Sequence, residues 1–254
     1  MAPRQTMPLN SLQPRCYWSV GDLSAQDTLA LLAGAKALQQ ALGGARPLAG
    51  RHVAVLSDAL HGVSASIFAA AAAALGAVVV HIRPLAAHLD EQQAAAELAR
   101  TLGRLYAAVE CDGLDEPAMQ QLANAAGVPV FNAVAGDIHP SRLLADLLTM
   151  RDHAQRPLAE MSLHVAVDAR SPLALCWRQV GRLTGVRVLA GAPGPGAPAP
   201  TADFICEPAR SSDRAEAPDL LAVDHASGRP QSLRKRQTEN HGYMVQAMLS
   251  SSIN

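Results

Sequence analysis

The sequence predicts an α/β protein with two doubly wound domains built on parallel sheets. Residues 52–82 follow the order strand, turn, helix, strand, which is the order of a βαβ unit. Strand-like and helix-like segments go on alternating as far as residue 150. A second series of short apolar strands then begins near Leu163. Because a strand–helix–strand connection joins parallel neighbours, both series favour parallel sheets.

The first helix is expected behind an N-terminal arm, residues 1–19. Ser24 followed by Asp27 is typical of a capping box at a helix start. Leucines at positions 29, 32, 38 and 42 then recur at roughly helical spacing, until Gly43–Gly44 ends the helix.

The other elements follow from short apolar runs and Ala-rich or Leu-rich stretches. Strands are expected at 52–56, 77–82, 107–110, 128–131, 163–167, 186–189 and 204–205. Helices are expected at 63–75, 91–105, 116–126, 141–150, 171–183 and about 231–250. The Pro/Gly-rich residues 191–200 cannot form regular structure. We expect one domain at 1–150 and a truncated second domain at 151–254, whose closing helix packs back on the first.

Composition and charge exclude several classes of function. The chain has 254 residues, 49% hydrophobic and 17% charged, which is typical of a globular protein and not of a disordered one. A net charge of −1 gives no electrostatic case for nucleic acid or an anionic membrane. The longest low-polarity run, residues 67–82, is broken by Gly76 and favours a helix and a strand over a membrane span. With no signal-peptide pattern at the N-terminus, the expected location is cytoplasmic.

No cofactor or metal is expected. The chain contains neither a GxGxxG nor a GxxxxGK[ST] motif. Its nine histidines are dispersed, and its four cysteines form no CxxC pair, so neither a metal site nor a disulfide framework is indicated.

Four segments together resemble the aspartate/ornithine carbamoyltransferase family, and its ornithine branch most closely. They are ARTLGRLYAAVE (99–110), LANAAGVPVFNAVAGDIHPSRLLADLLTMRDH (122–153), MSLHVAVDAR (161–170) and TENHGYMVQAML (238–249). The resemblance implies the carbamoyltransferase fold, with a carbamoyl-phosphate-binding domain followed by an amino-acid-binding domain. It also implies arginine metabolism and transfer of a carbamoyl group from phosphate to ornithine.

The donor side of such a site depends on fixed positive charge. The family carries an STRTR motif at a helix start, where two arginines bind the phosphate. Residues 61–65 read HGVSA here, so Val63 and Ala65 replace the arginines and Ser64 keeps only a hydroxyl. We expect a changed and weakened anion site at this turn.

Other residues match the family pattern or replace a part of it. Arg100 matches an arginine that contacts phosphate, His139 matches the histidine that polarises the carbonyl, and Arg142 replaces a glutamine. A remodelled anion pocket would therefore consist of His61, Ser64, Arg100, His139 and Arg142. The alternatives are that Arg100 pairs with Glu97 on a surface helix and that His139 only opens a helix.

The amino-acid side departs further from the family. No clear equivalent of its asparagine, aspartate, SMG turn or HCLP motif is present, which leaves Ser171, Glu207 and Asp224 as stand-ins. His241 replaces the arginine of the family's closing ENR segment. Losses on both sides of the site favour a catalytically inactive or strongly impaired protein with a role in binding or assembly.

Two other functions stay open. One is an active transferase with altered specificity that uses carbamoyl phosphate or another acyl phosphate. The other is a folded protein without a selected role. The resemblance implies a homotrimer, or a hetero-assembly with a related carbamoyltransferase, and a small anionic ligand as a further partner.

Overall fold

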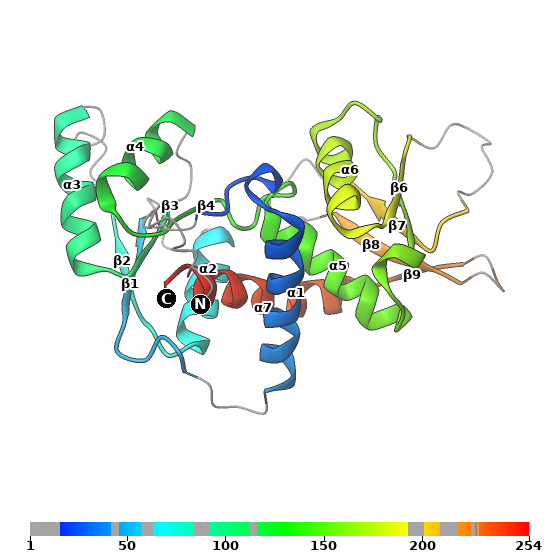
Figure 1. Ribbon diagram of the computed structural model, residues 1–254, viewed down its shortest axis with the longest axis horizontal. Helices are drawn as coiled ribbons and strands as arrows, with labels where there is room; N and C mark the ends of the chain where they lie inside the picture. The colour runs from blue at the N-terminus through cyan, green and yellow to red at the C-terminus, as the bar shows by residue number, and fades with distance from the viewer. Residues whose placement is uncertain are drawn as a thin grey trace, which may run out of the picture.

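The computed structural model describes residues 16–41, 46–56, 63–83, 92–111, 116–192, 201–208, 218–224, 227 and 229–253. These residues form two sheets at opposite ends of an elongated molecule, with a group of helices between them (Figure 1). The expected α/β class with parallel sheets is confirmed.

The first sheet has four parallel strands in the order β2-β1-β3-β4. Its strands are β1 (His52–Leu56), β2 (Val78–Ile82), β3 (Ala108–Cys111) and β4 (Val130–Asn132). The helices around it are α1 (Ala25–Gln40), α2 (Val63–Ala74), α3 (Gln92–Leu105), α4 (Glu116–Ala126), α5 (Pro140–Ala154) and α7 (Arg234–Ser252). The capping box of Ser24 and Asp27 is present at the start of α1, where each residue's side chain accepts from the other's backbone N–H.

The two faces of this sheet are buried by different helices because side chains alternate along a strand. Ala54 and Leu56 of β1 share a core with α3 and α4. Val53 and Val55 point to the other face and share a larger core with α1, α2, α5 and α7. The first sheet is therefore covered on both sides, which explains why most residues of its strands are apolar.

The second sheet has five strands in the order β6-β5-β7-β8-β9. They are β5 (Ser162–Val165), β6 (Arg187–Ala190), β7 (Phe204–Glu207), β8 (Asp219–Val223) and β9 (Pro230–Ser232), with α6 (Pro172–Thr184) between β5 and β6. Strands β5, β6 and β7 are parallel, but β8 and β9 run antiparallel, which departs from the expected parallel sheet.

The second sheet also differs from the expected doubly wound arrangement. Leu163 of β5 and Phe204 of β7 are buried on the face that α5 and α6 cover. On the other face, His164 and Ile205 remain half-buried. In the described part of the chain, helices thus pack on one face of this sheet only, so the antiparallel edge strands can face water on the other.

Helices α5 and α7 join the two halves of the molecule. Helix α5 runs without a break through residues 150–154, where the domain boundary was expected, and α7 packs against α5, α1 and α2. The carboxylate of Asp152 on α5 accepts from Lys36 Nζ at 2.7 Å and Gln39 Nε2 at 2.9 Å, both on α1. Although burial opposes ionisation of Asp152, these donors hold its pKa below the usual value. The division into 1–150 and 151–254 stays a prediction.

No helix of the described residues is long and apolar enough to cross a lipid bilayer. The described residues also contain no group of three or more His, Cys, Asp and Glu side chains placed to hold a metal ion.

Candidate functional site

The candidate site lies where the first turn of α5 meets α7. His139 is the N-cap of α5, and Pro140 occupies the first helical position, where its missing N–H costs nothing. His139 Nδ1 accepts from the backbone N–H of Ser141 at 3.1 Å. Since Nδ1 accepts, the proton of the neutral ring is on Nε2, which is shut off from solvent.

Ser141 connects this histidine to a second one on α7. Its hydroxyl lies 2.7 Å from His139 Nδ1 and 3.0 Å from His241 Nε2, and it donates to the Val134 carbonyl at 3.0 Å. His241 Nε2 also lies 3.0 Å from that carbonyl, which can only accept, so Nε2 carries the proton of His241. The turn that carries Val134 begins at Ala133, whose φ of 50° lies in the left-handed region. These groups form one closed network.

Both histidines of this network are buried and neutral at physiological pH. His139 is 5% exposed and His241 is 2% exposed. Burial, reinforced by the neighbouring His241, lowers the pKa of His139 to about 3 despite a contact with the Tyr17 main chain. Burial and the Arg142 guanidinium lower the pKa of His241 to about 4. The network therefore contributes no positive charge.

Arg142 is the buried cation of the site, in the first turn of α5. Its Nη2 donates to the Pro218 carbonyl at 3.3 Å, next to β8. Burial raises the pKa of Asp146 to about 6, although Arg142 and a 2.8 Å hydrogen bond from Gln237 Nε2 oppose the rise. Burial also raises the pKa of Asp137, again against Arg142. Arg142 thus lies among carboxyl groups and a carbonyl.

Residues 15–152 match the family described as "Aspartate/ornithine carbamoyltransferase, carbamoyl-P binding domain". The chain belongs to the aspartate/ornithine carbamoyltransferase family. It is 34% identical over 146 residues to an ornithine carbamoyltransferase of Cutibacterium acnes, an alignment that covers 58% of this chain and 44% of the relative. It is 37% identical over 140 residues to a catabolic ornithine carbamoyltransferase of Burkholderia mallei, covering 55% of this chain and 41% of the relative. The chain thus spans less than half the length of these curated relatives.

Solved carbamoyltransferases have the same fold over nearly the whole chain. The ornithine carbamoyltransferase of Burkholderia thailandensis aligns with a TM-score of 0.72 at 18% identity and covers 94% of this chain and 98% of its own. A putative aspartate carbamoyltransferase of Trypanosoma cruzi aligns with a TM-score of 0.71 at 18% identity, covering 96% and 98%. At this identity the likeness shows the fold alone.

The structure separates the donor-side residues that the carbamoyltransferase resemblance grouped. His139 and Arg142 lie on the same turn of α5. Arg100 is exposed on α3, where it lines a groove of about 540 Å³ between α3 and α4. His61 lies outside the described residues, and only the backbone of Ser64, in the first turn of α2, is described.

The amino-acid-side residues are divided between two opposite edges of the second sheet. Ser171 caps α6 by accepting from the Ala174 N–H at 3.2 Å, and Glu207 ends β7. Both follow parallel strands and therefore lie at the same edge of the second sheet. Because β8 runs antiparallel to β7, Asp224 lies at the opposite edge, where its carboxylate accepts from Ser227 Oγ at 2.6 Å.

Sequence reasoning missed three residues of this site: Ser141, Asp146 and Gln237. Ser141 and His241 are 100 positions apart, so no local pattern links them. One signal was available for Ser141, because a serine near the N-cap of a helix often forms a local hydrogen bond there.

Proposed function

We propose that this chain is an ornithine carbamoyltransferase-like protein that is catalytically inactive or strongly impaired and acts through binding or assembly. The observation that carries the proposal is the closed network of His139, Ser141 and His241. To polarise a carbonyl, an imidazole must present an N–H to the ligand. The His139 Nδ1 is used by Ser141, and its protonated Nε2 is buried away from solvent.

The charge of the site also supports the proposal. A carbamoyl-phosphate site has to neutralise a multiply charged phosphoryl group, and charge-assisted hydrogen bonds are the strong means of doing so. Ala65, at one of the two positions where the family motif has an arginine, is 1% exposed and packs in the apolar core. Two missing charge-assisted hydrogen bonds correspond to about 3–6 kcal/mol, or roughly two to four decades in rate.

Among the described residues of the predicted pocket, the two arginines do not offset this loss. The positive charge of Arg142 acts on Asp146 and Asp137, whose raised pKa values it opposes, and its Nη2 donates to the Pro218 carbonyl. Arg100 faces a different groove, so it adds its charge to the α3–α4 surface. A cytoplasmic protein with this fold that cannot activate carbamoyl phosphate would act by associating with itself or with an intact carbamoyltransferase.

The deciding measurement is citrulline formation from carbamoyl phosphate and ornithine, with the Cutibacterium acnes relative assayed in parallel. We expect a rate at least about 100-fold below that of the relative, from the two missing charged hydrogen bonds. A comparable rate would refute the proposal. Phosphate release that depends on carbamoyl phosphate and on an amine other than ornithine would favour the active transferase with altered specificity instead.

Assembly is tested separately by sedimentation equilibrium of the purified chain. We expect the mass of a trimer, alone or when mixed with an intact ornithine carbamoyltransferase. A monomer under both conditions would remove the assembly role and leave binding as the remaining activity.

A further inference from the structure

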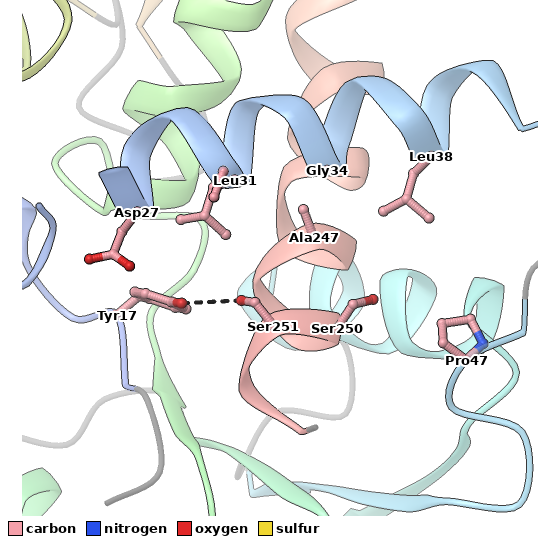
Figure 2. Close-up of a pocket in the computed structure, with 10 residues that line it drawn as sticks. Tyr17, Asp27, Leu31, Gly34, Leu38, Pro47, Ala247, Ser250 and Ser251 are labelled. Carbon is pink, nitrogen blue, oxygen red and sulfur yellow. Dashed lines mark hydrogen bonds between the residues drawn. The ribbon is translucent and has the colours of Figure 1, made fainter. Parts of the chain in front are cut away.

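The first sheet ends in two edge strands, β4 and β2 (Figure 1). At the β4 edge, side chains of the N-terminal arm serve the outward main-chain groups of Val130. Its N–H donates to Cys16 Sγ at 3.4 Å, and its carbonyl accepts from Trp18 Nε1 at 2.7 Å. Between these two residues, Tyr17 turns toward α7 and pairs with Ser251 Oγ at 3.1 Å, as Figure 2 shows. The arm is thus held in place where it covers the β4 edge.

The β2 edge lacks such partners. The Val78 N–H donates to the Arg51 carbonyl at 2.8 Å, so Val78 and every second residue after it direct their main-chain groups toward β1. The N–H and C=O groups of Val79 and His81 therefore point away from the sheet. In the part of the chain that the structure describes, these outward groups have no hydrogen-bond partner.

The side chains of β2 do not protect this edge either. Edge strands commonly carry a charged residue, a proline or a bulge that blocks pairing with another strand. Strand β2 consists of three valines, His81 and Ile82, and its register with β1 is unbroken. Val78 is 47% exposed, although a β-branched side chain is suited to a paired strand. The β2 edge is therefore apolar and open to pairing.

The strand is complementary to itself in one antiparallel register, with Val80 on a two-fold axis. Val79 of one protomer then lies opposite His81 of the second copy, and the outward N–H and C=O groups of these residues satisfy one another. In the same register the exposed Val78 lies opposite Ile82, and Val80 meets its own copy. Each of these cross-strand pairs is apolar, which favours pairing.

We propose that β2 pairs with β2 of a second copy of this chain, which joins two four-stranded sheets into one continuous sheet across a two-fold axis. A two-fold contact cannot by itself close a three-fold ring, so it is separate from the trimer expected above. It is also independent of the proposed loss of carbamoyl transfer. Two short strands form a small interface beside the roughly 1,200 Å² or more of a stable complex, so the pairing is weak and is best detected by a covalent trap.

The test is disulfide trapping of Val80→Cys at high protein concentration with copper–phenanthroline, measured as the fraction of covalent dimer on a non-reducing gel. A non-hydrogen-bonded antiparallel pair brings its two Cα atoms to about 4.5 Å, which a disulfide can span. Val78→Cys is the matched control, on the same face of the same strand and at a more exposed position. In the proposed register the two copies of residue 78 are roughly 13 Å apart along the strands.

We expect Val80→Cys to give about fivefold more dimer than Val78→Cys, because only the former pair is within disulfide distance. Random collisions would instead favour the more exposed position 78. Wild type measures the background from the native cysteines, of which Cys16 and Cys176 are partly exposed. Equal yields at the two positions, or a Val80→Cys yield at the wild-type level, would overturn the proposal.

A proline at position 81 tests whether the main chain makes the contact. In the Val80→Cys background, His81→Pro removes an outward N–H without disturbing the ladder to β1. The dimer yield should fall to that of Val78→Cys, whereas His81→Thr, which keeps the N–H, should leave it unchanged. Far-ultraviolet circular dichroism establishes that each variant is folded, and the two cysteine variants alone decide the matter if the proline variant is not. Trapping that survives the proline in a folded protein would contradict strand pairing.

Discussion

Acidification from pH 7 to pH 4.5 is expected to lower the free energy of unfolding by about 3 kcal/mol, because His139 and His241 are buried in the neutral form. Their pKa values in the folded protein, about 3 and about 4, lie below the ordinary value of 6.5. Below pH 6.5 these two histidines bind protons in the unfolded chain but stay neutral in the folded chain. The stabilisation is therefore complete above pH 6.5 and is lost as the pH falls.

The size of the effect follows from how far pH 4.5 lies from the ordinary pKa of each group. At pH 4.5 each histidine is two pH units below its ordinary pKa, which costs about 2.7 kcal/mol, or about 5 kcal/mol for both. Asp146 acts in the opposite direction, since its folded pKa of about 6 exceeds the ordinary 3.8. The stabilisation by protonated Asp146 is present at low pH and is lost as the pH rises through 6. At pH 4.5 it therefore offsets about 2 kcal/mol of the loss caused by the histidines.

Urea unfolding at the two pH values, followed by the fluorescence of the buried Trp177, measures this difference. His241→Asn removes one of the two histidine titrations. Because Asp146 nearly offsets the other one, the stability of this variant should hardly depend on pH in this range. His52→Asn, at an exposed position on β1, should leave the pH dependence of wild type unchanged. A wild-type stability that is equal at both pH values would contradict the buried, neutral network.

Gly103→Ala is expected to lower the free energy of unfolding by about 3 kcal/mol, at the upper end of overpacking costs. A Cβ at Gly103 on α3 would lie 1.8 Å from the Ala126 carbonyl oxygen and 2.7 Å from its carbon, at the end of α4. Both atoms belong to the backbone, so the clash is relieved only when α3 and α4 move apart. That movement would open the core that Leu102 and Ala99 share with α4.

Thermal unfolding measures the effect, and a decrease of roughly 10 °C in Tm is expected for a chain of this size. Gly242→Ala on α7 serves as the control, because it adds the same methyl group within a helix but the new Cβ meets no atom within 4 Å. That control should gain up to about 1 kcal/mol from helix propensity. One kcal/mol corresponds to roughly 2–4 °C in Tm for a chain of this size. A Tm for Gly103→Ala within about 2 °C of the control would therefore show that α3 and α4 are not in close contact at Gly103.

The first sheet could be predicted from the sequence because its strands are short apolar runs between helices with clear ends. The predicted helix at 116–126 is α4 residue for residue, and the strand at 52–56 is β1. Strand β9 could not be predicted, since Pro230, Gln231 and Ser232 are all exposed and show no alternation. It exists because β8 pairs with it.

The candidate site was only partly predictable, because it too depends on contacts between residues far apart in the sequence. The motif match indicated His139 and the position of His241, but the sequence does not reveal that Ser141 bonds both rings. Grouping Arg100 with His139 rested on the order of motifs along the chain. The amphipathic character of α3 turns Arg100 toward the α4 groove instead.

Helix α7 bears on how the chain acquires its structure during synthesis. Met244, Val245, Met248 and Leu249 of this late segment complete the core beneath α1, α2 and α5. The amino-terminal half therefore leaves the ribosome with an apolar surface that is covered only when α7, which begins 80 positions after the end of α5, has been made. Such long-range closure slows folding, so the nascent chain is expected to depend on chaperones until α7 emerges.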